Sequence, residues 1–162
     1  MPKLPLPEVL VEMLARGPAH IEESTVGLAD AQTGQTPPDY GWSVNEVLAH
    51  LRSCADVWGR NISTILLEKH SIIQALSPPS WLAQTNYLEL PFSESFPAFA
   101  EQRGGLVTQL RHLHAGDWVR SAMVVGAGRP VERTVHLYTE WIAVHERAHL
   151  KQIRRIALAI RP

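Results

Sequence analysis

Residues 134–160 read TVHLYTEWIAVHERAHLKQIRRIALAI, and in this stretch apolar side chains recur every three or four positions. Side chains at that spacing share one face of an α-helix, so the stretch predicts a long helix from about Thr134 to Ile160. The predicted buried stripe comprises Tyr138, Trp141 or Ile142, His145, His149, Ile153, Ile156 and Ile160. Two histidines are therefore expected on the face of this helix that meets the rest of the protein.

A second helix has a clear start in the sequence WSVNE, residues 42–46. Ser43 and Glu46 match the S-x-x-E capping box, in which each side chain satisfies a free backbone N–H. Trp42 and Val47 flank this cap and match the pattern of a hydrophobic staple. An apolar stripe continues to about residue 69, which predicts a helix of that extent.

Two further segments are also predicted to be helical, although their sequence signals are weaker. Residues 7–30 have helical spacing, but Gly17-Pro18 should kink or break this helix because proline lacks an N–H donor. A further helix over about 95–114 contains two adjacent glycines, which lower its helix propensity. VRSAMVV could be a short extended stretch, but no segment shows convincing strand alternation. The sequence therefore predicts an all-α protein, a four-helix bundle.

Composition narrows the classes of function. A chain of 162 residues fits one domain with a substantial core, so residues 1–162 are expected to form a single domain. No apolar run approaches the roughly 20 residues that span a bilayer, and the N-terminus does not resemble a signal peptide. One cysteine excludes an internal disulfide and suits a reducing cytoplasm. A net charge of −1 argues against nucleic-acid binding.

The sequence HERAH, residues 145–149, matches H-E-x-x-H, in which two histidines bind a metal and the glutamate acts as a base. Three interpretations are open: a metallopeptidase site, another kind of metal site, or two core histidines. A stable site needs a third protein ligand, and residues 150–162 contain neither an acid nor a histidine. The best upstream candidate is His50, on or beside the inner stripe of the second helix. Three histidines and water would leave open positions, as in catalytic sites.

Two motifs give the chain a resemblance to a known family. The pattern W-S-x-x-E-[VIL]-L-x-H-L covers residues 42–51, and H-x-x-x-H-L-x-Q-[IL] covers residues 145–153. Together they resemble the DinB/YfiT-like superfamily of small metal-binding four-helix bundles. The stretches GLADAQTGQTPPDYGWS and GDWVR also look like that family, so the resemblance touches most of the chain.

The resemblance implies that His50, His145 and His149 are a metal triad, typically for zinc, nickel or iron(II). It also implies an up-down-down-up bundle, often a homodimer, and relatives that include bacillithiol- or mycothiol-dependent transferases and isomerases. We therefore expect a cytoplasmic, metal-dependent enzyme that activates a low-molecular-weight thiol, or water, for transfer to a small electrophilic substrate. The alternatives are a metal-dependent hydrolase with Glu146 as base, and a non-catalytic dimeric bundle whose metal is structural or absent.

Several other side chains each have two interpretations. Glu146 is a candidate base or a surface residue, and Gln152 either orients a ligand imidazole or packs elsewhere. Cys54 is expected to be a small buried hydrophobe rather than a pocket residue. Trp81 and Tyr87, in the Pro-rich loop, are expected to be packing anchors, with walls of a substrate pocket as the alternative.

Overall fold

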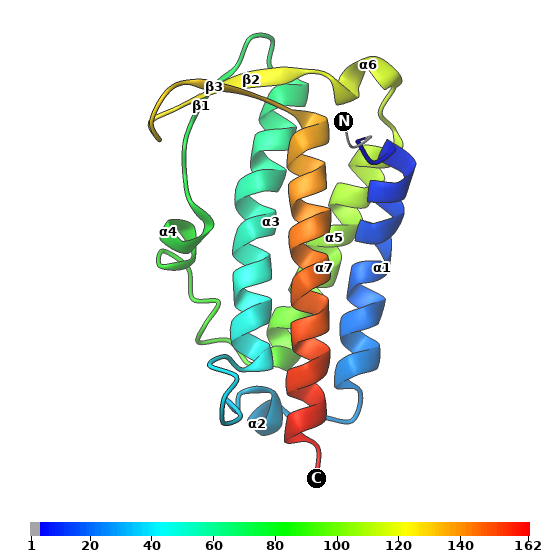
Figure 1. The fold of residues 1–162 in the computed structure, drawn as a ribbon, viewed down its shortest axis with the longest axis vertical. Helices are drawn as coiled ribbons and strands as arrows, with labels where there is room; N and C mark the ends of the chain where they lie inside the picture. The colour runs from blue at the N-terminus through cyan, green and yellow to red at the C-terminus, as the bar shows by residue number, and fades with distance from the viewer. Residues whose placement is uncertain (1–3) are drawn as a thin grey trace.

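The computed structural model describes residues 4–162, and four long helices make up most of it (Figure 1). These are α1 (Pro7–Thr25), α3 (Val44–Leu67), α5 (Phe92–Arg111) and α7 (Val135–Ile160). The connections between them contain the short helices α2 (Asp30–Thr33), α4 (Pro78–Leu82) and α6 (Ala115–Trp118), and the strands β1 (Ile72–Gln74), β2 (Ser121–Val125) and β3 (Val131–Thr134). The predicted all-α bundle is thus confirmed as the main architecture, with a small sheet added.

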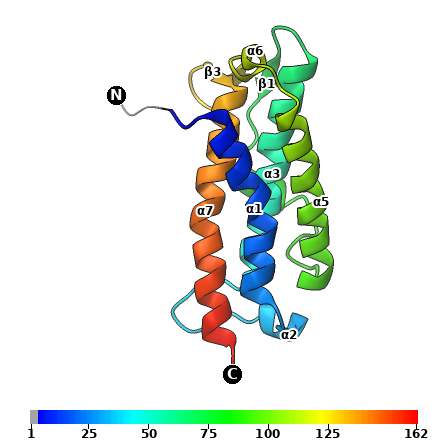
Figure 2. The same cartoon turned by 90° about the vertical axis from the view of Figure 1, so that its right-hand side faces the viewer.

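The direction of each of the four long helices depends on the long connection between α3 and α5. In Figure 1, α1 and α7 run downwards, whereas α3 and α5 run upwards. Helix α7 packs between α1 and α3, and α5 packs against the same two helices from behind (Figure 2). Because the chain returns through α4 before α5 begins, α3 and α5 point the same way. This arrangement is the expected up-down-down-up topology.

Both helices that carry the motif histidines begin at well-formed caps. At the start of α3, Ser43 Oγ accepts from the Glu46 N–H at 3.1 Å, and the Ser43 N–H donates to Glu46 Oε2 at 2.7 Å. At the start of α7, Thr134 Oγ1 accepts from the Leu137 N–H at 3.1 Å. The capping box predicted from the sequence is therefore present, and it fixes where α3 begins.

Three features differ from the sequence-based expectation. Helix α1 is one continuous helix across Pro18, and it ends at Thr25 rather than near residue 30. Packing against α5 and α7 holds the helix despite the missing N–H, because tertiary contacts override local propensity. The loop 77–91 contains the short helix α4.

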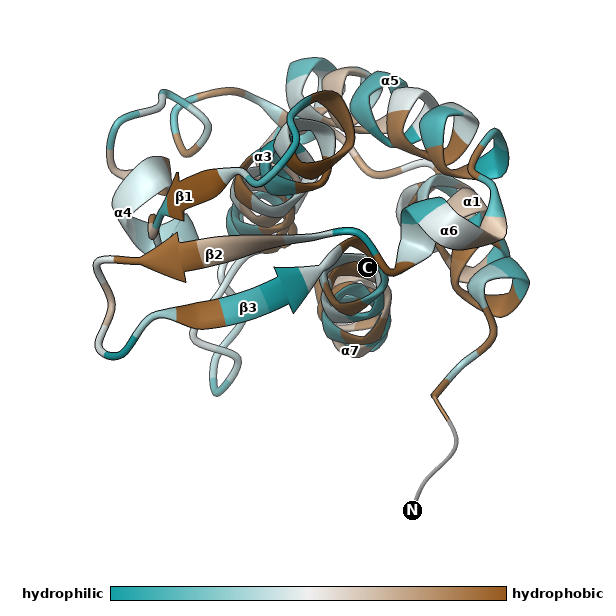
Figure 3. Ribbon diagram, turned by 90° about the horizontal axis from the view of Figure 1, so that it is seen from above, coloured by the Kyte–Doolittle hydropathy of each residue, from teal (hydrophilic) through white to brown (hydrophobic). Residues whose placement is uncertain are grey.

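The third difference is a three-stranded sheet, which covers one end of the bundle (Figure 3). Strand β2 pairs antiparallel with β3 and parallel with β1. The strands are only three to five residues long, too short for a visible alternation of apolar and polar side chains. The parallel partner of β2 is β1, which lies about 50 residues upstream, so no local sequence pattern predicts this pairing.

The core of the bundle consists of two apolar clusters. The sheet-end cluster includes Leu10, Leu14, Ile62, Ile65, Leu106, Leu110, Tyr138 and Ile142. The tail-end cluster includes Ile21, Val47, Leu48, Leu51, Phe99, Ile153 and Ile156. The long helices carry polar or very small residues within or between their contributions to the two clusters: Gly17, His50, Ser53, Cys54, Arg103, His145, Glu146 and His149. These residues form a layer, called here the polar layer, and the functional site lies in it.

Candidate metal centre

The three motif histidines converge where α3 and α7 pack against each other. Nε2 of His145 lies 3.1 Å from Nε2 of His50 and 3.1 Å from Nε2 of His149. One ring nitrogen from each of the three lies within 4.8 Å of the others, so a single ion could contact all three. His145 and His149 are one helical turn apart, so they leave α7 on the same face, and His50 meets them from α3.

The protonation of these rings suits a metal. Partial burial, followed by the proximity of the other histidines, lowers the pKa of His145 to about 4. Burial and then His149 also lower the pKa of His50. Both rings are therefore neutral at physiological pH, and a neutral imidazole is the form that binds a metal ion. Three imidazole nitrogens fit a borderline divalent ion such as zinc, nickel or iron(II).

Gln152 orients one of the rings. Its Oε1 lies 2.7 Å from Nδ1 of His149, so Nδ1–H donates to the amide oxygen. That bond places the lone pair of His149 on Nε2, the nitrogen that faces the other two histidines. The structure therefore brings Gln152 to the orienting position considered from its sequence spacing.

Two tryptophans enclose the histidines, and the sequence pattern did not single them out for this position. The Trp42 ring stacks on His149 with an interplanar angle of 14° and meets His50 edge-on. Trp58 meets His145 edge-on, with the ring centroids 5.4 Å apart. Trp58 lies one turn beyond Cys54, which lies one turn beyond His50, so its helical spacing from His50 was the available signal.

Cys54 lies beside the site as a buried neutral thiol. Its Sγ is 3.7 Å from Nε2 of His50, and 3% of the residue is exposed. Burial raises the pKa of the Cys54 thiol to about 12. In this state the side chain packs as a small apolar group, in line with the interpretation favoured from the sequence.

The geometry does not support the base role considered for Glu146. Its side chain is buried in the bundle, where Oε2 accepts from Nη1 of Arg103 on α5. The backbone of Gly17 on α1 lies against the other carboxylate oxygen. Glu146 and Arg103 are each only 2% exposed. Successive residues of a helix point about 100° apart, so Glu146 and His145 face different neighbours.

The loop between β1 and α5 is tied to α3 through one carboxylate. Asp56 Oδ2 accepts from Trp81 Nε1 at 2.8 Å and from the Tyr87 hydroxyl at 2.6 Å. Arg52 lies over the Tyr87 ring and Arg60 over the Trp81 ring. Both aromatic residues therefore anchor the loop, as expected from the sequence, and Asp56 is the partner that the sequence did not reveal.

Solvent reaches the site from one side. A depression of about 610 Å³ is lined by Asp39, Tyr40, Ala148, His149, Gln152 and Arg155. His149 is thus a wall of an open hollow as well as a member of the triad. Of the three histidines, His149 is the one that lines this hollow, together with Gln152.

Comparison with a family model identifies the family of the chain. The family model described as the DinB superfamily matches residues 13–153. The chain belongs to the DinB superfamily. No curated protein sequence matches the chain.

One solved structure with a similar fold is that of YfiT from Bacillus subtilis, described as a probable metal-dependent hydrolase with an unusual four-helix bundle topology. The similarity covers 98% of this chain and 91% of that chain, with a TM-score of 0.79 and 18% sequence identity. At this identity the likeness establishes the DinB fold. Within residues 4–162, no helix combines the length and apolar character that crossing a membrane requires.

Proposed function

We propose that this DinB-superfamily protein is a metal-dependent enzyme in which His50, His145 and His149 bind one divalent ion. The observation that carries the proposal is the convergence of three imidazole nitrogens beside a solvent-accessible depression. A divalent ion held by three histidines keeps open positions, and it supplies Lewis acidity that lowers the pKa of water or a thiol.

The side chains around the three histidines have separate roles in this proposal. Gln152 holds the His149 ring in one tautomer, and burial keeps His145 and His50 unprotonated. Trp42 and Trp58 fix the ring planes by contact. Because Glu146 is paired with the buried Arg103, it would not serve as the base at this site. The substrate would be a small electrophilic molecule that enters along the His149 depression.

Two nucleophiles fit this site, and each has its own support. Transfer of a low-molecular-weight thiol is the activity implied by the resemblance of the two histidine motifs. Hydrolysis, with water as the nucleophile, agrees with the description of YfiT as a probable metal-dependent hydrolase. Assays that pair electrophilic substrates with and without a thiol separate the two, because only the transferase requires the thiol.

Metal content tests the shared part of the proposal. Untagged wild-type protein should carry close to one divalent ion per chain by mass spectrometry, and His50→Ala and His149→Ala should lose it. The matched control is His112→Ala, which removes an exposed histidine from the end of α5. Wild-type protein that stays empty after incubation with zinc, nickel and iron(II) would overturn the proposal.

A further inference from the structure

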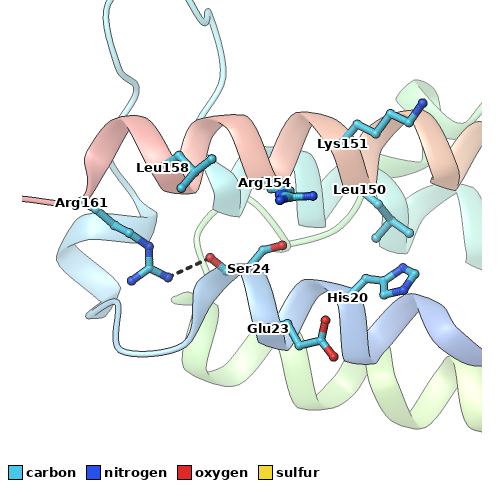
Figure 4. Close-up of a pocket in the computed structure, with 8 residues that line it drawn as sticks. All are labelled: His20, Glu23, Ser24, Leu150, Lys151, Arg154, Leu158 and Arg161. Carbon is cyan, nitrogen blue, oxygen red and sulfur yellow. Dashed lines mark hydrogen bonds between the residues drawn. The ribbon is translucent and has the colours of Figure 1, made fainter.

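A second hollow lies between the C-terminal halves of α1 and α7. It has a volume of about 370 Å³ and is lined by His20, Glu23, Ser24, Leu150, Lys151, Arg154, Leu158 and Arg161 (Figure 4). None of the three metal-site histidines is among these residues. The volume lies within the range of small-molecule sites. We call this hollow the α1–α7 groove.

Cations dominate the groove although the whole chain is slightly acidic. Three of the lining residues are Lys or Arg, and Glu23 is the single acid among them. Lys151 and Arg154 are exposed, and neither belongs to any ion pair within residues 4–162. The charge is also segregated, because residues 147–162 contain five Lys and Arg residues and no acid. The groove therefore has positive charge that the protein itself leaves uncompensated.

One of the cations is held in place by the backbone. Nη2 of Arg161 donates to the carbonyl oxygens of Ser24 and Val26, each at 3.0 Å (Figure 4 shows the Ser24 bond). These carbonyls belong to the C-terminal end of α1, where the helix dipole would otherwise repel an anion. The guanidinium has five N–H donors, so Nε and Nη1 remain available to a ligand. Arg161 thus closes one end of the groove with an ordered cation.

The groove also has an apolar component. Leu150 is half-buried and packs on the tail-end cluster, and Leu158 is 62% exposed. Both leucines and the cations Lys151 and Arg154 come from the same stretch of α7, so apolar and positive surfaces adjoin. A ligand that satisfies both needs an anionic group and an apolar body.

We propose that the α1–α7 groove is a binding site for a small organic anion, whose carboxylate or phosphate group is attracted by the positive charge of Lys151, Arg154 and Arg161. Leu150 and Leu158 contact the apolar body of the ligand, and the Ser24 hydroxyl and His20 ring supply further hydrogen bonds. The site is separate from the metal centre, and its occupancy does not depend on a bound metal ion.

Calorimetric titration of the full chain with phenyl phosphate, benzoate, benzyl alcohol and inorganic phosphate tests this site. Phenyl phosphate or benzoate should bind more tightly than neutral benzyl alcohol and than inorganic phosphate. Lys151→Gln and Arg154→Gln should each weaken binding roughly two- to fivefold, as expected for exposed charge pairs. His50→Ala should leave binding unchanged, which separates this site from the metal centre.

The matched control is Arg129→Gln, which removes one exposed charge from the turn between β2 and β3. If Arg129→Gln weakens binding as much as Arg154→Gln, the anions respond to net charge alone and the site is refuted. Equal affinity for inorganic phosphate and phenyl phosphate would show an adventitious ion only. Absence of binding by both aromatic anions, with the fold intact by circular dichroism, would also overturn the proposal.

Discussion

The missing side chain of Gly17 leaves the space that the Glu146 carboxylate occupies. A Cβ built on Gly17 would overlap Oε1 of Glu146 and lie 3.5 Å from Nη1 of Arg103. The glycine therefore leaves room for the buried ion pair, in a helix where glycine otherwise costs stability relative to alanine. Its role is close approach between helices rather than an unusual backbone angle.

Gly17→Ala should lower the free energy of unfolding by about 1–3 kcal/mol, because the new methyl group displaces a buried carboxylate from its partner. Gly104→Ala on α5 is the matched control, since a Cβ there meets nothing within 4 Å. That control should raise stability by about 0.5–1 kcal/mol through helix propensity. Urea unfolding of both variants measures the difference, and a stabilised Gly17→Ala protein would contradict the packing argument.

Gln152 is joined to the proposed metal centre by one hydrogen bond to His149. Gln152→Leu removes the acceptor and should weaken metal affinity about 10- to 100-fold, the usual effect of losing the partner of a ligand imidazole. Gln152→Glu keeps an acceptor at the same distance and should retain affinity. Competition with a chelating dye measures both, and equal affinities for the two variants would show that Gln152 does not orient the ring.

At the scale of the elements, the Arg103–Glu146 pair joins α5 to α7 inside the polar layer. A buried ion pair is weak evidence for stability, because the free energy lost by removing two charges from water offsets most of the free energy gained from their attraction. We expect the pair instead to fix how α7 is rotated about its axis, since Glu146 lies between the two histidines of that helix. Correct rotation aims His145 and His149 at α3.

Single and double replacements separate stability from positioning. Arg103→Met or Glu146→Leu alone leaves one buried charge and should cost about 3–5 kcal/mol of unfolding free energy. The double variant has no buried charge and should unfold with nearly wild-type or higher stability. Its metal affinity should nevertheless fall, because the rotation of α7 is less fixed. A double variant with wild-type stability and wild-type metal affinity would contradict this role.

At the scale of the whole molecule, the stability of the metal-free protein should depend on pH through the histidine cluster. The pKa of His145 is about 4 in the folded protein, below the ordinary value of 6.5 in the unfolded chain. Between these values the unfolded chain binds more protons, so the free energy of unfolding falls as pH drops from 6.5 towards 4. Above pH 6.5 both states are neutral and this contribution vanishes.

Thermal unfolding of the metal-free protein across pH 4–7 measures this effect. His145→Gln removes the imidazole whose pKa is about 4 in the folded protein, so its melting temperature should fall less steeply between pH 6.5 and 4 than that of the wild type. Parallel slopes for His145→Gln and wild type would assign the acid sensitivity to other groups.

Much of the fold was predictable because the signals are local. The capping box at Ser43 and the apolar period of α7 depend on residues within a few turns of one another, so the starts of both helices could be placed. The triad was predictable because His145 and His149 share a helix face and the family motif includes His50. The expected homodimer, the cytoplasmic location and the assignment of residues 1–162 to one domain stay predictions.

The four long helices, their histidine faces and the family could be inferred from the sequence, because periodicity, caps and motifs involve neighbouring residues. The buried partner of the glutamate in HERAH became clear only from the folded chain. Its partner Arg103 is 43 residues away and the glycine that makes room for it lies on a third helix. The pairing of β1 with β2 is equally non-local. Such contacts depend on how segments far apart in the sequence pack together, which local sequence patterns do not predict.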